Sequence, residues 1–274
     1  MTTVPNSRRN LDAAIERIAG RGRAYVKART IMADTIVAQM LPNGAVKGGS
    51  ALKLRFGESM TRFSKDLDTA RIGDIGEYVE ALNIALEEGW EGFTGIAIRK
   101  QPATPKNVPS GYVMQPCEVK LNYLGKSWVT VPLEIGHNEI GDAEEFEMVV
   151  PSDAARLFEA LGFPLPKPIP IMALHHQIAQ KLHGATEPNS HRAHDLVDLQ
   201  LIVANGGINY PRTRQTCERL FSYRGMQPWP PTVIENTGWE TLYADAAEGL
   251  NVEPSIRRAV TWANEFINEI AYSA

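Results

Sequence analysis

Lys47-Gly48-Gly49-Ser50, followed by Arg62-Phe63-Ser64-Lys65-Asp66-Leu67-Asp68, is the part of the chain that says most about how it folds. It predicts a short strand over 45–47, a glycine turn, a helix that opens at Ser50, and a second strand that carries Asp66 and Asp68. Side chains two residues apart on a strand share a face, so both carboxylates point toward one site. Free N–H groups at a helix start bind phosphate, and paired aspartates bind Mg²⁺. Together these residues indicate chemistry on a nucleoside triphosphate.

Length and composition exclude several classes of protein. The 274 residues suffice for one large domain or two small ones with a hydrophobic core. The formal charge of −4, from 28 basic and 32 acidic residues, limits any nucleic-acid contact to a local patch. Cys117 and Cys217 form no CxxC pattern, which argues against a disulfide framework or a zinc knuckle. Without a signal-peptide pattern or an apolar run of about 18 residues, we expect a soluble, cytoplasmic protein with no membrane segment.

Hydrophobic periodicity divides the chain into a mixed part and a helical part. A long helix is expected over 11–41, broken near Gly20–Gly22, and the run 162–170 is too rich in proline to be helical. Period-two patterns predict strands over 93–98, 113–124, 127–135 and 147–150. Further helices are predicted over 75–88, 171–184, 192–204, 211–223, 239–248 and 255–271. The predicted fold class is α+β, with a small mixed or antiparallel sheet in a lobe over 1–160 and an all-helical lobe over 161–274.

A third acid is expected beside the aspartate pair, because metal-assisted phosphoryl chemistry usually uses one. The strand 127–135 offers Glu134. Its apolar face is formed by Val129, Val131, Leu133 and Ile135, and its other face by Trp128, Thr130, Pro132 and Glu134. Each of these acids alone would be read as a solvated side chain. Beside the glycine turn they form a candidate metal site of Asp66, Asp68 and Glu134, with Ser64 on the same face as the aspartates.

A competing site lies on the strand before it. Glu118-Val119-Lys120, together with an acid such as Asp68, matches the residue set of metal-dependent nucleases. The E-x-K pattern is also common on exposed strand faces. Spacing alone leaves both interpretations open, with the solvated strand face favoured.

The helical part contains charged residues on faces that should be buried. Lys181 falls within the apolar stripe of its helix, Arg192 and Asp195 point into the stripe of the next helix, and Asp198 lies at its margin. Buried charges are costly unless they are paired or bound to a ligand. One interpretation is an internal salt bridge from Asp195 to Lys181 or Arg192. The other is that the cations bind the triphosphate, and both can hold at once.

Five histidines gather in the same region: His175, His176, His183, His191 and His194. Histidine is a common metal ligand, but no HExxH pattern or cysteine partner accompanies them. We therefore favour RNA contact or a solvated face over a structural metal.

Two blocks of this sequence resemble one known family. KGGSALKLRFGESMTRFSKDLDTA, over 47–70, is similar to the KGGTAL…RFSxDLD signature of the AbiEii/AbiGii toxin family of nucleotidyltransferases, which includes MenT-like toxins. Arg192-Ala-His-Asp195-Leu-Val-Asp198-Leu199 resembles that family's R-x-K-D-L-x-D-L helix, with Lys181 in the place of its preceding lysine. Glu134 in VPLEIG loosely matches the strand of the third acid, where aspartate is common. The linker 57–62 is about two residues longer than usual, and His194 replaces a basic residue.

The resemblance implies a DNA polymerase β-like nucleotidyltransferase fold and a toxin of a toxin–antitoxin or phage-defence pair. It implies NTP as substrate, a tRNA 3′ end or another RNA as acceptor, a cognate antitoxin as partner, and Mg²⁺, with Mn²⁺ as the alternative ion. Asp66, Asp68 and Glu134 would hold the metal and act in catalysis with Lys181. The nucleotide would be bound by Gly49 and Ser50, including the Ser50 hydroxyl, and by Arg62, Ser64, Lys181, Arg192 and Asp195.

Two other functions fit the same residues. A metal-dependent nuclease would use Asp68, Glu118 and Lys120 and would shorten RNA without consuming NTP. A catalytically inactive, toxin-like binding subunit would bind metal and NTP without turnover. The intact Gly-Ser pair and both aspartates argue mildly against the inactive subunit.

Overall fold

The chain divides into two compact units in the computed structural model, which describes residues 3–103 and 113–273. The first unit comprises Met1–Glu58 and Phe63–Met172, and the second comprises Ser59–Arg62 and Ala173–Ala274. The sequence pattern placed the boundary between 160 and 161. The first unit extends further because β7 (Ile169–Met172) pairs with β1 and β6 and so belongs to the sheet.

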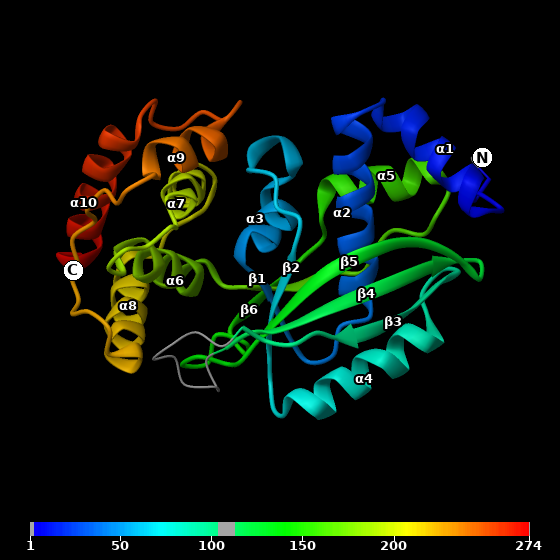
Figure 1. Cartoon of the computed structure of the whole chain (residues 1–274), viewed down its shortest axis with the longest axis horizontal. Coiled ribbons are helices and arrows are strands. Elements are labelled where there is room, and N and C mark those ends of the chain that lie inside the picture. Colours follow the sequence, from blue (N-terminus) through cyan, green and yellow to red (C-terminus); the bar gives the residue numbers. More distant parts are fainter. Residues whose placement is uncertain (1–2, 104–112, 274) are drawn as a thin grey trace. The chain divides into compact units, whose positions relative to one another are not determined.

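A seven-stranded mixed sheet with the strand order β3-β4-β5-β2-β1-β7-β6 forms the centre of the first unit (Figure 1). β1 pairs antiparallel with β2 and parallel with β7, and β2 pairs parallel with β5. The remaining pairs are antiparallel, and β3 and β6 are the two edges. Besides β7, the strands are β1 (Gly44–Lys47), β2 (Leu67–Arg71), β3 (Phe93–Arg99), β4 (Gln115–Tyr123), β5 (Lys126–Gly136) and β6 (Phe146–Val149). The predicted α+β class with a mixed sheet is confirmed.

The helices of the first unit follow local start and stop signals. They are α1 (Arg8–Ala19), α2 (Arg23–Gln39), α3 (Gly48–Phe56), α4 (Ile75–Glu88) and α5 (Ser152–Leu161). The predicted break at Gly20–Gly22 separates α1 from α2, and Asp74 caps α4 by accepting from the N–H groups of Gly76 and Glu77. Helix α5 was not predicted, although the left-handed Gly162 that ends it is an ordinary stop signal.

One hydrophobic core joins the helices to one face of the sheet. Val46, Leu67, Leu133 and Ile135 are fully buried there and share the core with side chains of α1, α2, α4 and α5. Figure 1 shows α4 running alongside β3. Because side chains alternate along a strand, the neighbours of these apolar residues point to the opposite face. That opposite face carries Lys47, Asp68 and Glu134.

The alternation predicted for β5 is wrong at Trp128. The sequence pattern put it on the polar face with Glu134, whereas its side chain is buried and its indole N–H donates to Asp12 Oδ1 at 2.8 Å. The pairing of β4 with β5 shifts register between Leu121 and Asn122, close to this end of β5. A bulge of this kind interrupts strict alternation.

The regular secondary structure among the described residues of the second unit is helical. Its helices are α6 (Leu174–Thr186), α7 (His194–Asn205), α8 (Tyr210–Arg224), α9 (Trp239–Ala247) and α10 (Ile256–Ala271). The predicted start of α6 at Ile171 is wrong, because Ile169–Met172 pairs with the sheet and the helix begins at Leu174. Across the described parts of the chain, none of the helices combines the length and apolar character needed to cross a membrane.

Candidate active site

The turn between β1 and α3 requires glycine at position 48. Gly48 has a φ of +66°, and a Cβ atom there would lie 2.2 Å from Asp68 Oδ2. A side chain would therefore strain the backbone and displace the carboxylate of Asp68. The predicted glycine turn is present, and α3 begins at Gly48 rather than at Ser50.

Ser50 fastens this turn to β2. Its hydroxyl donates to the carbonyl oxygen of Lys47 at 3.0 Å and accepts from the N–H of Asp68 at 3.1 Å. The Ser50 side chain is fully buried. The hydroxyl that was expected to face phosphate therefore positions the backbone of Asp68.

A row of charged residues crosses three neighbouring strands. Lys47 of β1 lies opposite Asp68 of β2, which lies opposite Glu134 of β5, so their side chains share one face of the sheet. The amine of Lys47 reaches over Gly136, where a Cβ atom would lie 2.5 Å from its Nζ. Glu134 thus occupies the position that the sequence predicted beside Asp68.

The prediction that the strand carries both aspartates is wrong for Asp66, which lies in the bend before β2 and is exposed, whereas Asp68 is within the strand and partly buried. Burial raises the pKa of Glu134, the charge of Asp66 raises it further, and Lys47 opposes both effects. Carboxylate oxygens are hard ligands, the kind that a divalent cation such as Mg²⁺ prefers. Asp66, Asp68 and Glu134 offer the oxygen donors that Mg²⁺ and Mn²⁺ prefer, although their oxygens do not all lie within 4.8 Å of one another in this structure.

The residues of the nuclease alternative are arranged differently. Glu118 lies opposite Pro132, and its carboxylate is 3.0 Å from Lys100 Nζ. Lys120 lies opposite Thr130 and is exposed. The strand pairing places Glu134, and not Glu118, directly opposite Asp68.

A buried ion pair close to these residues was missed by the sequence analysis. Lys53 Nζ lies 2.5 Å from Asp34 Oδ2 and donates to the carbonyl oxygen of Ser64 at 3.1 Å. Lys53 is 0% exposed and Asp34 is 1% exposed. A lysine in the buried helix α3 and an aspartate within the buried run Ile31–Ala38 of α2 were the signals available. The sequence pattern predicted that Ser64 lies on the strand with the aspartates. Ser64 instead lies in an irregular segment before that strand.

The charged residues of the second unit form a network of their own. Lys181 Nζ donates to Asp195 Oδ1 at 3.2 Å and to Asp198 Oδ2 at 2.6 Å. Arg192 Nε donates to Asp195 Oδ2 at 2.6 Å, and Arg62 donates to both oxygens of Asp198. The internal salt bridge that the sequence suggested is present, with Arg62 as a further member. Arg192 is the most accessible of the three cations, with half of its side chain exposed.

The network controls the ionisation of its acids. Burial alone would raise the pKa of Asp195, but Lys181 and Arg192 outweigh it and hold that pKa well below the ordinary range. Burial also acts to raise the pKa of Asp198, and Lys181 and Arg62 lower it overall. Burial lowers the pKa of His194 despite the nearby charge of Asp195. Both aspartates are therefore ionised at neutral pH.

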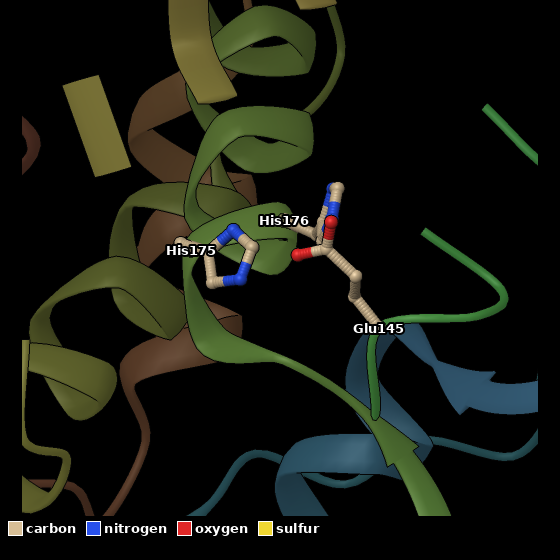
Figure 2. Close-up of side chains that lie close together, drawn as sticks. All are labelled: Glu145, His175 and His176. Atoms are coloured by element: carbon tan, nitrogen blue, oxygen red, sulfur yellow. The ribbon is translucent and has the colours of Figure 1, made fainter. Parts of the chain in front are cut away.

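The histidines of the second unit do not form the solvated face that was expected for them. His175, His176 and His183 are buried, while His191 is exposed. Figure 2 shows the side chains of His175 and His176 on the first turn of α6, with Glu145 of the first unit also labelled. His175 Nδ1 lies 2.9 Å from the hydroxyl of Thr216, and the two imidazole rings are 4.4 Å apart. Burial of this kind excludes a direct RNA contact for these three side chains in this conformation.

A helix that starts at a glycine turn, beside carboxylates on two strands, suits an enzyme that transfers part of a nucleotide. The family model described as "Nucleotidyl transferase AbiEii toxin, Type IV TA system" matches residues 30–263. The chain therefore belongs to the AbiEii family of nucleotidyltransferase toxins of type IV toxin–antitoxin systems. The resemblance read from the sequence is confirmed, and the chain is an enzyme of the nucleotidyltransferase class.

The chain is similar to solved structures, and the first of them shares its fold. MenT4, a nucleotidyltransferase toxin from Mycobacterium tuberculosis H37Rv, is 19% identical with a TM-score of 0.50, over 95% of this chain and 97% of that one. JHP933 from Helicobacter pylori is 15% identical with a TM-score of 0.47, over 91% and 93% of the two chains. A comparison with curated protein sequences gives no match.

Proposed function

We propose that this toxin transfers a nucleotide from an NTP to a hydroxyl group at the 3′ end of tRNA and releases pyrophosphate. The observation that carries the proposal is the row of Lys47, Asp68 and Glu134 beside the glycine turn that opens α3. A helix start and a group of carboxylates on one surface suit a triphosphate and its cation.

The start of α3 would bind the triphosphate. Backbone N–H groups of Gly49 and Ser50 have no partner within the first turn of a helix and carry the positive end of its dipole. The buried Ser50 hydroxyl would keep its bonds to Lys47 and Asp68 and hold the turn in place. Ser64 would contribute near the nucleotide through the segment that leads to Asp66.

Asp66, Asp68 and Glu134 would hold Mg²⁺ or Mn²⁺. When bound, such an ion supplies positive charge to the phosphates and makes the acceptor hydroxyl more acidic. Glu134 would accept the proton of that hydroxyl, since a carboxylate whose pKa is raised is the stronger base. Asp66 and Asp68 would orient the reacting groups, and catalysis would rest on positioning and electrostatics.

The cations of the second unit would offset the charge of the triphosphate. Lys181, Arg62 and Arg192 are three positive groups that contact two negative ones, Asp195 and Asp198, which leaves one positive charge in excess. Asp195 would orient Lys181 and Arg192 for this role. Arginine is suited to phosphate because its guanidinium offers several donors in a fixed plane.

Labelled NTP and total RNA test the proposal. Incubation with each α-labelled NTP should label tRNA, and mass analysis of the tRNA should show added nucleotide at its 3′ end. Asp68→Asn is the control and should abolish labelling. A nuclease would shorten RNA without consuming NTP, and an inactive binding subunit would leave both unchanged. Label that enters another RNA or a protein instead would assign a different acceptor.

Co-purification with the product of the neighbouring gene tests for the antitoxin partner.

A further inference from the structure

Lys53 joins three separate parts of the first unit. It lies on α3, one helical turn after Ser50, and its amine contacts Asp34 on α2 and the carbonyl oxygen of Ser64. Ser64 is two residues before Asp66, and its hydroxyl donates to the carbonyl oxygen of Asp66 at 3.4 Å. A chain of contacts therefore runs from α2 through the helix of the glycine turn to the first of the metal carboxylates.

The segment that Lys53 contacts is not part of a helix or a sheet with regular backbone hydrogen bonds. Residues 61–66 lie outside every helix and strand. Backbone groups in such a segment must find partners elsewhere if they are buried. Arg62 of this stretch is held by Asp198, and the bond from Lys53 to the Ser64 carbonyl is a second, separate restraint that lies closer in sequence to Asp66.

Lys53 and Asp34 are charged residues in a buried position. Taking a lysine and an aspartate fully out of water is costly, and apolar residues of similar volume often replace a buried ion pair without loss of stability. Stability alone therefore gives little reason for Lys53 and Asp34. Burial raises the pKa of Asp34, Lys53 acts to lower it, and the charge of Asp66 adds to the rise, so the pair and Asp66 interact electrostatically.

We propose that Lys53 and Asp34 are positioning residues, which hold segment 64–66 against α3 so that Asp66 is placed for binding a divalent cation. The inference rests on the metal site of the proposed function. Asp34 orients the amine of Lys53, Lys53 fixes the Ser64 carbonyl, and the short path to Asp66 transmits that restraint. Neither residue touches the substrate in this scheme.

Mn²⁺ binding to the resting protein, measured by electron paramagnetic resonance without NTP, tests the proposal. The double variant Asp34→Leu/Lys53→Met replaces the pair by apolar groups of similar size. Its melting temperature should equal or exceed that of the wild type, while its Kd for Mn²⁺ should rise about 10- to 100-fold, as for other groups that orient metal ligands. Lys27→Met is the matched control, since Lys27 lies on α2 and contacts Glu58 at 3.7 Å. It should leave Mn²⁺ binding unchanged.

A folded double variant with wild-type Mn²⁺ affinity would overturn the proposal. Should the double variant fail to fold, Asp34→Asn decides, because it keeps the shape of the side chain and removes only its charge. It should weaken Mn²⁺ binding in the same direction, and an unchanged Kd would again reject the idea. Lys53→Arg, which retains a cation, should bind Mn²⁺ more tightly than Lys53→Met.

Failure of this inference can be told apart from failure of the proposed function. The binding measurement requires neither nucleotide nor acceptor. Wild-type protein that binds Mn²⁺ through Asp68, but transfers nothing to RNA, would refute the function and leave the positioning role intact. Wild-type activity in the double variant would refute the positioning role and leave the function intact.

Discussion

Both carboxylate oxygens of Asp198 accept hydrogen bonds from Arg62, which lies 136 residues earlier in the chain. The bonds measure 2.9 Å and 3.0 Å, the paired geometry in which a planar guanidinium binds a carboxylate. Lys181 approaches the same carboxylate at 2.6 Å. The short segment 59–62 therefore belongs to the helical second unit, although the residues before and after it in sequence belong to the first unit.

Asp198→Asn should destabilise the helical unit in a pH-dependent way. Removing one member of a buried ion cluster costs about 3 kcal/mol, at the low end of the usual range because Lys181 keeps Asp195. The pKa of Asp198 lies below its ordinary value of 3.8, so its contribution is present above that value and is lost as pH falls through the lowered pKa. Thermal melts should show a constant difference from wild type near neutral pH that shrinks in acid.

Asp245→Asn provides the control for that measurement, because Asp245 is exposed on α9 of the same unit. It should change the melting temperature little at any pH. A difference between wild type and Asp198→Asn that stays constant down to strong acid would show that the carboxylate charge does not stabilise the network.

Gly48→Ala should damage the active site beyond its effect on the backbone. A left-handed alanine costs about 1 kcal/mol. Gly22 has a similar positive φ, +64° against +66° for Gly48, but no atom lies within 4 Å of the Cβ that alanine would add. Gly22→Ala should therefore show only the loss of stability. Gly48→Ala should also lose metal affinity, since its methyl group meets the carboxylate of Asp68.

Calorimetric Mg²⁺ titration of both glycine variants checks this expectation. Equal metal affinity in the two would mean that Asp68 can move aside without cost. The comparison addresses the contact with Asp68, because the two substitutions add the same methyl group at glycines with a positive φ, and only the methyl group at position 48 meets another residue.

Local pattern was enough to predict Asp68 and Glu134 on strands, and it failed for Asp66, which precedes its strand, and where distant segments meet. Alternation put Glu134 on the polar face, and strand pairing brought it opposite Asp68. The Lys53–Asp34 pair joins two helices, and its members could not be matched from helical periodicity because each looks like an isolated charge in an apolar run. The contact between Arg62 and Asp198 was not predicted, because a contact 136 residues away leaves no trace in spacing. Trp128 was misplaced because a register shift interrupts the period of two.

Arg192→Gln should weaken NTP binding while leaving the fold intact. Half of the Arg192 side chain is exposed and the buried Asp195 keeps Lys181 as a partner, so this substitution should cost less stability than Asp198→Asn. Loss of a charge-assisted bond to phosphate should raise the KM for NTP about tenfold. Arg214→Gln on α8 is the control, since Arg214 is similarly exposed and pairs with Glu218 at 2.9 Å. Equal KM values for the two variants would confine Arg192 to orienting Asp195.

Glu134→Gln should stabilise the metal-free protein and abolish much of its response to metal. Burial and the charge of Asp66 raise the pKa of Glu134 above its ordinary value of 4.5, so the ionised side chain opposes folding. The stability of the metal-free protein therefore falls as pH rises from the ordinary pKa of Glu134 to its raised pKa in the folded protein. Glutamine removes this charge and should raise the melting temperature at neutral pH in a chelating buffer. Added Mg²⁺ should raise the melting temperature of the wild type more than that of the variant, because a ligand that binds only the folded state stabilises it in proportion to its affinity. Glu118→Gln is the control, because Glu118 is a strand glutamate outside the proposed metal site. Gln115→Glu is unsuitable as a control, since Gln115 is buried and bonded to Arg99. A wild-type response to Mg²⁺ in Glu134→Gln would remove Glu134 from the metal site and leave the aspartates as the cation's protein ligands.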